Sequence, residues 1–345
     1  MNEIVDLRSD TVTHPTPAMR EATYTAEVGD DVFGDDPTTN RLEEMAAERL
    51  GKEAALFVAS GTMGNLVALL THCGRGDEVI LGDCAHIFLN EQGGMAALGG
   101  ITPRPIPNQP DGTLRLEEIV GAIRGDDPHL PRTRLVCLEN TQNVCNGAPL
   151  TAEYTARVAR LAHDRDLQVH MDGARIFNAA AALEVDVREL VQEVDSVMFC
   201  LSKGLCAPVG SILCGSADFI ARARRARKVV GGGMRQVGIL AAAGIVALEQ
   251  IADRLAEDHV RAKRLAEGLA EIPGLGVAPV TTNILYFWLT EEVSKTSEEV
   301  WQALADRGVL VLGRGGVRFR AVTHYWINDE DIERTIEVMR AVIGR

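Results

Sequence analysis

The sequence predicts an open α/β fold, a mainly parallel sheet covered by helices, followed by a smaller α+β unit. Between residues 54 and 215, short runs rich in Val, Ile and Leu alternate with longer amphipathic segments, which is typical of such a sheet. The 345 residues, 46% of them hydrophobic, are enough for one large and one smaller domain. The helix stop and turn Ile272-Pro273-Gly274 separate the two patterns.

The predicted strands of the first unit are short apolar runs, and the predicted helices lie between them. The strands are Ala54–Val58, Glu78–Leu81, Arg134–Glu139, Leu167–Met171, Ser196–Leu201 and Val209–Cys214. The helical patterns are Met63–Thr71, Glu117–Arg124 and Thr151–Asp164. Ligands of open α/β sheets bind beyond the carboxyl ends of the strands, so we look for functional residues there.

The second unit follows a long helical pattern from about Arg235 to Glu271. Strands Asn283–Leu289 and Val317–Val322 flank the predicted helix Ser297–Arg307, and an Asp-capped amphipathic helix, Asp329–Ile343, follows. We therefore expect a large domain of residues 1–250 and a small α+β domain of residues 251–345, packed closely with a cleft between them.

Composition and charge exclude several classes of function. A net charge of −14 argues against a nucleic-acid-binding surface, which needs clustered basic residues. Seven cysteines without a C-x-x-C pair predict reduced, mostly buried thiols and neither a disulfide framework nor a zinc site, so we expect no metal. The sequence starts without a signal-peptide pattern and has no long apolar run, which predicts a cytoplasmic protein with no membrane partner.

Three short motifs at predicted strand ends carry the chemistry. Asp172 ends the run Val169–Asp172 and is followed by Gly and Ala, so its carboxylate could pair with a protonated ring nitrogen. Lys203 leaves the next apolar strand, where partial burial favours the free amine that Schiff-base chemistry requires. The segment Ser60–Asn65 opens a helix with small residues whose backbone N–H groups can cradle one phosphate.

Each motif alone also has an ordinary explanation: a turn, a solvated lysine and a capped helix. Their order along one sheet edge, however, indicates a site for pyridoxal 5′-phosphate (PLP), which contains a phosphate, a basic ring nitrogen and an aldehyde.

Longer blocks of sequence extend the pattern over nearly the whole chain. They are Asp6–Thr13, Gly29–Pro37, Ser60–Asn65, His170–Arg175, Ser196–Gly210, Gly231–Gln236 and Arg320–His324. Together these blocks resemble those of the low-specificity L-threonine aldolases, which are fold type I PLP-dependent enzymes with a transferase-like fold. The resemblance implies a large domain with a mainly parallel seven-stranded sheet and a small C-terminal α+β domain. It also implies that residues 1–30 reach the active site and pack with the small domain.

For the cofactor, the resemblance implies that Lys203 binds PLP as a Schiff base and that Asp172 pairs with the ring nitrogen. His86 would stack on the ring, and Arg175 would lie close to the phenolic oxygen. Ser60, Gly61 and Thr62 would hold the phosphate. Arg235 belongs to a Gly-rich segment that the family places near a neighbouring subunit's active site, in an assembly that is usually a homotetramer, a dimer of dimers.

For the substrate, the resemblance implies that Ser9, Arg175 and Arg320 contact the carboxylate of a small amino acid. A clamp of two guanidinium groups fixes orientation, and only the Cα bond perpendicular to the conjugated ring can break with its electrons delocalised. The implied reaction is cleavage of the Cα–Cβ bond of L-threonine, L-allo-threonine or another β-hydroxy-α-amino acid into glycine and an aldehyde such as acetaldehyde.

Two positions depart from the family pattern. Gln142 stands where the family commonly has a histidine near the substrate hydroxyl; it can form hydrogen bonds at the catalytic site but cannot act as a base near neutral pH. His86, directly or through a water, then becomes the expected proton acceptor. Phe33 stands where many relatives have Tyr, near the mouth of the active site, which favours more apolar β-substituents.

Two alternatives remain open. Another fold type I enzyme, such as a β-eliminating lyase, an aminotransferase or a racemase, would cleave a different bond on the same scaffold. A PLP-binding regulatory protein without catalysis would belong to another class of function, and Gln142 is the feature that supports it.

Overall fold

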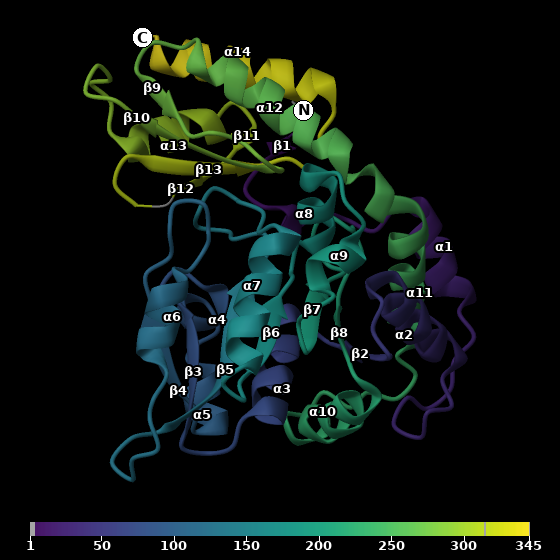
Figure 1. The fold of residues 1–345 in the computed structure, drawn as a ribbon. Coiled ribbons are helices and arrows are strands. Elements are labelled where there is room, and N and C mark those ends of the chain that lie inside the picture. The colour runs from purple at the N-terminus through teal and green to yellow at the C-terminus, as the bar shows by residue number, and fades with distance from the viewer. Residues whose placement is uncertain (1–3, 314, 345) are drawn as a thin grey trace.

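The computed structural model describes residues 4–313 and 315–344, and a seven-stranded sheet lies at the centre of this part of the chain (Figure 1). The strand order is β2-β8-β7-β6-β5-β3-β4, and only β8 runs against the other six. The strands are β2 (Ala54–Val58), β3 (Asp77–Gly82), β4 (Thr102–Ile106), β5 (Arg132–Glu139), β6 (Gln168–Asp172), β7 (Ser196–Cys200) and β8 (Ser211–Gly215). The predicted α/β class and the mainly parallel sheet are confirmed.

Strand β4 was not among the predicted strands, because Pro103 and Pro105 interrupt its apolar pattern. Proline cannot donate a backbone hydrogen bond, so it is tolerated only where one side of a strand has no neighbour. Accordingly, β4 lies at the edge of the sheet and pairs on one side only, in parallel with β3.

Helices cover both faces of the sheet, and alternate side chains of each strand point to opposite faces. In β7, Val197 and Phe199 join one hydrophobic core while Met198 and Cys200 join the other. The first face is covered by α2 (Pro37–Leu50), α6 (Leu116–Ala122), α7 (Ala152–His163), α8 (Ile176–Leu183), α9 (Val187–Val191) and α11 (Gly238–Val246). The second face is covered by α3 (Gly61–His72), α4 (His86–Leu89), α5 (Gly94–Gly99) and α10 (Ala217–Val229). Helix α1 (Pro17–Thr25) packs against α11.

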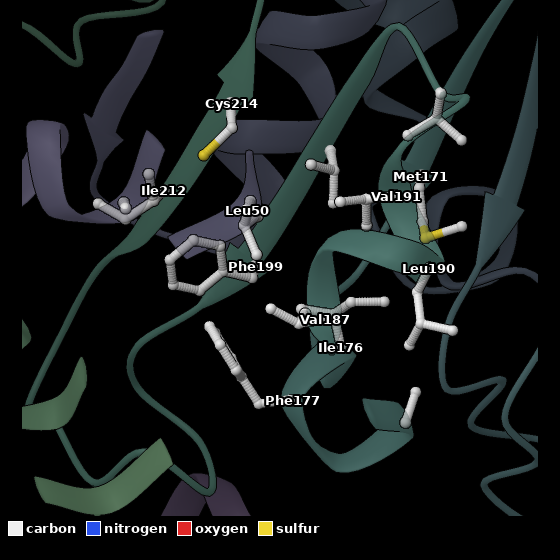
Figure 2. Close-up of a cluster of buried hydrophobic side chains, with 14 of the residues drawn as sticks. Leu50, Met171, Ile176, Phe177, Val187, Leu190, Val191, Phe199, Ile212 and Cys214 are labelled. Carbon is white, nitrogen blue, oxygen red and sulfur yellow. The ribbon is translucent and has the colours of Figure 1, made fainter. Parts of the chain in front are cut away.

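The larger core supports the strand ends that carry the predicted site residues. Figure 2 shows Phe177 of α8 facing Phe199 of β7, and the two rings meet edge to face with centroids 5.3 Å apart. Leu190 and Met171 lie nearby, and all four side chains are buried. Burying such side chains contributes roughly 1.5–3 kcal/mol each. The carboxyl ends of β6 and β7 are thus held in a rigid, close-packed part of the molecule.

The helical pattern predicted from Arg235 to Glu271 is wrong as a single helix. It begins at Gly238, and α11 passes into a π-helical turn (Ala247–Ile251) and a 3-10 turn (Ala252–Arg254) before α12 (Leu255–Ala270). The changed winding lets the first part pack in the core of the large sheet, whereas Leu265 and Leu269 of α12 pack in a second core. A π-helical turn contains one more residue than an α-helical turn, and the spacing of apolar residues in the sequence does not show this insertion.

The second core belongs to a four-stranded antiparallel sheet, β12-β13-β10-β9, at the top of Figure 1. Its elements are β9 (Leu275–Val277), β10 (Ile284–Leu289), α13 (Ser297–Ala305), β12 (Leu312–Gly313), β13 (Arg318–Val322) and α14 (Asp329–Ile343). Helix α14 is capped by Asn328 in a capping box with Asp331, which corrects the expected Asp cap. The division of the chain at residues 250 and 251 stays a prediction.

The N-terminal segment lies beside this second core. Strand β1 (Val5–Asp6) pairs in parallel with β11 (Val309–Leu310), and the Trp326 indole donates a hydrogen bond to the carbonyl of His14 at 2.8 Å. Further on, Thr13 Oγ1 donates to the carbonyl of Lys203 at 2.9 Å. The segment therefore connects the second core with the carboxyl end of β7.

Three further expectations concern charge, thiols and membranes. All seven cysteines are free, and five of them are buried, as predicted. Helix α10 carries several basic residues between Arg222 and Lys228. One of them, Arg227, is buried and pairs with Asp31 at 2.6 Å, so its role is structural. None of the helices in the described ranges is long and apolar enough to cross a membrane.

Candidate functional site

A cavity of about 210 Å³ lies at the carboxyl edge of the large sheet. Six of the residues predicted from the sequence line it: Ser60, Gly61, Thr62, His86, Asp172 and Lys203. The remaining lining residues are Asn65, Glu91, Ala174, Met198, Cys200 and Ser202. The edge at which parallel strands end therefore brings together residues that are far apart in the sequence.

One wall of the cavity is the N-terminus of α3. Ser60 caps the helix, because its Oγ accepts the N–H of Met63 at 3.2 Å and its carbonyl accepts the N–H of Gly64 at 3.0 Å. Among the described residues, the N–H groups of Gly61 and Thr62 have no protein acceptor. A Cβ atom on Gly61 would lie 2.9 Å from the Cys200 sulfur, so only glycine lets the helix start so close to β7. These free donors suit one phosphate group.

A second wall is Asp172, the last residue of β6. Its carboxylate is buried and accepts two hydrogen bonds, from Asn65 Nδ2 to Oδ2 at 2.9 Å and from the Ala174 N–H to Oδ1 at 3.1 Å. Both donors are uncharged, so they orient the carboxylate without neutralising it. The negative charge remains available for a protonated ring nitrogen.

His86 lies at the start of α4 and is held from two sides. Its Nδ1 donates to Glu91 Oε1 at 2.9 Å, and its backbone N–H donates to Glu139 Oε2 at 2.7 Å. The hydrogen bond to Glu91 raises the pKa of His86. Among the described residues, no protein group bonds Nε2, which is the nitrogen left for a ligand in the cavity.

Lys203 is half-buried, three residues after the end of β7, and its backbone is fixed by the hydrogen bond from Thr13. Its side chain lines the same cavity as Asp172 and the N-terminus of α3. An amine, a carboxylate and free backbone donors around one cavity match the aldehyde, the ring nitrogen and the phosphate of PLP. The chemistry of this donor set therefore fits that cofactor.

The predicted clamp residues lie around Asp10, which the sequence did not single out. Arg175 Nε and Nη2 donate to the two oxygens of Asp10 at 2.6 and 2.7 Å, and both side chains are buried. Burial alone would raise the pKa of Asp10, but Arg175, and then Lys203 and Arg320, hold it well below its usual range. The only signal for Asp10 in the sequence is its place in the N-terminal motif block.

The other two clamp residues are also held by hydrogen bonds within the protein. Ser9 caps the 3-10 turn that starts at Asp10, with its Oγ accepting the N–H of Thr11 at 3.2 Å. Arg320, on β13, is buried and donates to Asn143 Oδ1 at 2.8 Å and to the carbonyl of Arg8 at 3.2 Å. The clamp thus combines the N-terminal segment, the large sheet and the smaller sheet.

Gln142 is not brought into the cavity. It is buried, its Nε2 donates to the Cys84 carbonyl at 2.9 Å and to Glu139 Oε2 at 3.3 Å, and its Oε1 accepts the N–H of Cys145 at 2.8 Å. Its amide is therefore fully used within the protein. Sequence reasoning also missed Glu139, a buried carboxyl whose pKa is raised by burial and by the nearby Asp172.

Phe33 and Arg235 lie together, but not at this cavity. The Phe33 side chain is 76% exposed, and the Arg235 guanidinium lies over its ring at 6.0 Å. Arg235 also donates to Asp30 at 2.8 Å. The two residues form a surface cluster within one chain.

A larger cavity of about 680 Å³ lies elsewhere, beside α2, α8, α9 and the π-helical turn. Four of its charged groups form two ion pairs, Arg49 with Asp253 and Arg188 with Asp186. The lining residues that the structure describes include neither lysine nor histidine. This cavity has no set of groups that suits the predicted chemistry.

Comparison with known proteins agrees with the geometry. Residues 6–292 match the beta-eliminating lyase family. The chain is 50% identical to low-specificity L-threonine aldolase 1 of Arabidopsis thaliana, over 96% of this chain and 94% of that one. It is 48% identical to the low specificity L-threonine aldolase of Escherichia coli K12, over 99% of this chain and the whole of the other.

Solved structures share the fold at lower identity. A threonine aldolase from Leishmania major superposes with a TM-score of 0.83 at 21% identity, covering 98% of this chain and 99% of that one. Serine palmitoyltransferase from Sphingomonas wittichii gives 0.77 at 18% identity, covering 98% and 87%. The chain therefore belongs to the beta-eliminating lyase family, and its full-length similarity groups it with the low-specificity L-threonine aldolases of that family.

Proposed function

We propose that this protein is a PLP-dependent aldehyde-lyase that cleaves L-threonine, L-allo-threonine and other β-hydroxy-α-amino acids to glycine and an aldehyde such as acetaldehyde. The observation that carries the proposal is the single cavity lined by Lys203, Asp172 and the free N–H groups of Gly61 and Thr62. The near-full-length similarity to low-specificity L-threonine aldolases supports the same reaction.

The positions of these residues around one cavity support the following roles in cofactor binding. When bound, PLP withdraws electrons from Cα of an attached amino acid. Lys203 holds the cofactor covalently, and Ser60, Gly61 and Thr62 hold its phosphate. Asp172 keeps the ring nitrogen protonated, because its carboxylate receives only neutral hydrogen bonds from the protein. His86 stacks on the ring.

The substrate carboxylate is bound by Ser9, Arg175 and Arg320. Asp10 occupies the Nε and Nη2 edge of Arg175, so Nη1 is the nitrogen that Asp10 leaves for the substrate carboxylate. A buried, doubly bonded guanidinium has little freedom to rotate, so it fixes the direction of the substrate. Because that direction decides which Cα bond breaks, Asp10 is a positioning residue of the clamp.

The proton of the β-hydroxyl is accepted by His86, directly or through a water. Its Nδ1 is bonded to Glu91, so Nε2 is the atom that accepts the proton, and the raised pKa of the imidazole favours this transfer. Gln142 takes no part in this step, since its amide is already bonded on both sides.

The match to the beta-eliminating lyase family favours one second candidate, a lyase that eliminates a β-substituent. The two reactions give different products from the same substrate. The purified protein, supplied with PLP, should convert L-threonine and L-allo-threonine into equal amounts of glycine and acetaldehyde. Formation of 2-oxobutyrate without glycine would show elimination in place of aldol cleavage.

We propose that the protein is a cytoplasmic homotetramer. In this assembly, Arg235 binds the cofactor of a neighbouring subunit, and Phe33 borders the mouth of that subunit's active site. The exposed Phe33–Arg235 cluster supports this, since neither residue lies at the cavity of its own chain. Light scattering of the purified protein should give four times the chain mass.

Complementation between subunits tests the sharing of sites. Lys203→Ala and Arg235→Ala chains should each be nearly inactive alone, and co-expression should restore activity, since the second chain keeps its lysine and receives Arg235 from the first. A monomer in solution, or no restoration in mixed assemblies, would contradict a shared site.

A further inference from the structure

The side chain of Asn65 lies between the two acidic residues of the cavity. It belongs to the second turn of α3 and is 1% exposed. Its Nδ2 donates to Glu91 Oε1 at 2.8 Å and to Asp172 Oδ2 at 2.9 Å, while its Oδ1 lies 3.1 Å from His170 Nε2. One amide thus contacts both acids of the cavity and also His170.

The direction of this amide follows from its partners. Carboxylate oxygens only accept hydrogen bonds, so the two acids must face the NH2 group. Oδ1 then accepts the Nε2 proton of His170. His170 Nδ1 therefore accepts from Ser196 Oγ at 2.8 Å, and Ser196 Oγ accepts from His72 Nε2, also at 2.8 Å. Every proton of this chain of hydrogen bonds has a defined place.

Both histidines of the chain are neutral near neutral pH. Burial lowers the pKa of His170 to about 3 and that of His72 to about 4. A neutral imidazole has one donor and one acceptor nitrogen, as the assignment requires. The network therefore runs between α3 and the sheet, from His72 at the end of α3 to Asp172, without adding a positive charge beside that carboxylate.

We propose that Asn65 is a positioning residue for the cofactor ring, oriented by His170. Through Asp172 it places the carboxylate that pairs with the ring nitrogen. Through Glu91 it places His86, the imidazole that stacks on the ring, because Glu91 Oε1 accepts from both Asn65 and His86. This inference rests on the proposed function, since it assumes that PLP binds in the cavity.

An amide suits this position for electrostatic reasons. Polar atoms of His86, Glu91 and Asp172 lie within 4.8 Å of one another, so a third acid in place of Asn65 would add repulsion. A basic side chain would neutralise Asp172 and remove the charge that keeps the ring nitrogen protonated. Two N–H groups of one neutral amide satisfy both acids and leave their charges unchanged.

The test is Asn65→Leu, which keeps the approximate size and removes both donors. The protein is loaded with PLP labelled with 15N in the ring, and the 15N resonance, the visible absorption and the Kd for PLP are measured. We expect the resonance to move from the protonated toward the unprotonated position, the absorption to change, and the Kd to rise about tenfold, the effect of roughly one lost charge-assisted hydrogen bond.

Matched variants separate this role from a general effect on folding. Asn65→Ser, which keeps one donor, should shift the resonance in the same direction by a smaller amount. This variant replaces Asn65→Leu in the test if the leucine variant does not fold. Asn283→Leu removes a buried amide that bonds Thr323 away from the cavity, and should leave the resonance unchanged.

The outcomes are distinct. Loss of stability in the folded Asn65 variants with an unchanged 15N resonance and absorption would overturn the positioning role. If the unsubstituted protein itself does not bind PLP, the proposed function fails instead.

Discussion

The cavity at the sheet edge and the cavity beside α2 and α9 differ in the burial of their charges. The first measures about 210 Å³, and its acids, Asp172 and Glu91, are buried with defined hydrogen-bond partners. The second measures about 680 Å³, and its ion pairs, such as Arg49 with Asp253, are largely exposed to solvent. Exposed pairs are screened by water, whereas buried charges persist only with well-placed partners. Volume is therefore a poorer guide to function here than buried polar chemistry.

The largest effect is expected from Lys203→Ala. Loss of the amine that holds the cofactor should abolish glycine formation from L-threonine and remove the visible absorption of the purified protein. Lys263→Ala, in an exposed helix position, is the control and should keep both. If the Lys203 variant turned over L-threonine at the wild-type rate, the smaller cavity would have no chemical role that distinguishes it from the larger one.

The next effect concerns the ion pair next to the site. Asp10→Asn leaves the buried Arg175 without its anion, so the free energy of unfolding should fall by about 3–5 kcal/mol and KM for L-threonine should rise. Denaturant unfolding and steady-state kinetics measure the two quantities. A loss below about 1 kcal/mol would place this pair in the same class as the exposed ones.

The buried histidine network predicts a pH dependence of stability. The pKa of His72 is about 4 in the folded protein and 6.5 in an unperturbed histidine, so between these values the unfolded chain binds more protons. The contribution of His72 to the free energy of unfolding is therefore fully present above about pH 6.5 and is lost as the pH decreases. Between pH 7 and pH 5 this loss is about 2 kcal/mol.

His72→Gln should flatten that slope, measured by denaturant unfolding at the two pH values. His129→Gln, at an exposed position, should not change it. Equal slopes for the wild type and the His72 variant would show that the folded protein does not keep this histidine neutral.

The smallest effect is expected at the larger cavity. Asp253→Asn breaks the pair with Arg49 and should lower the free energy of unfolding by about 1 kcal/mol or less, with kcat and KM for L-threonine unchanged. A clear change in kcat or KM would show that the larger cavity takes part in the reaction.

Local pattern was a good guide to the elements and to the residues next to strand ends. The runs of β2 and α14 were predicted with their observed bounds, because each has a clean apolar pattern and a cap or turn beside it. Pattern failed where geometry depended on neighbours, as at the proline-containing edge strand β4 and at the π-helical turn before α12.

The α/β class, the family and the candidate residues Lys203, Asp172 and Ser60–Thr62 could all be predicted from the sequence. The folded structure was needed to show that Asn65 bonds Asp172, that Glu91 bonds His86 and that Asp10 bonds Arg175. It also showed that Gln142 does not line the cavity. These contacts could not be predicted because the hydrogen bonds join distant parts of the chain: 165 positions separate Asp10 from Arg175, and 107 separate Asn65 from Asp172. The local sequence shows which side chains follow a strand, but the residues that orient these side chains are brought into contact by tertiary packing.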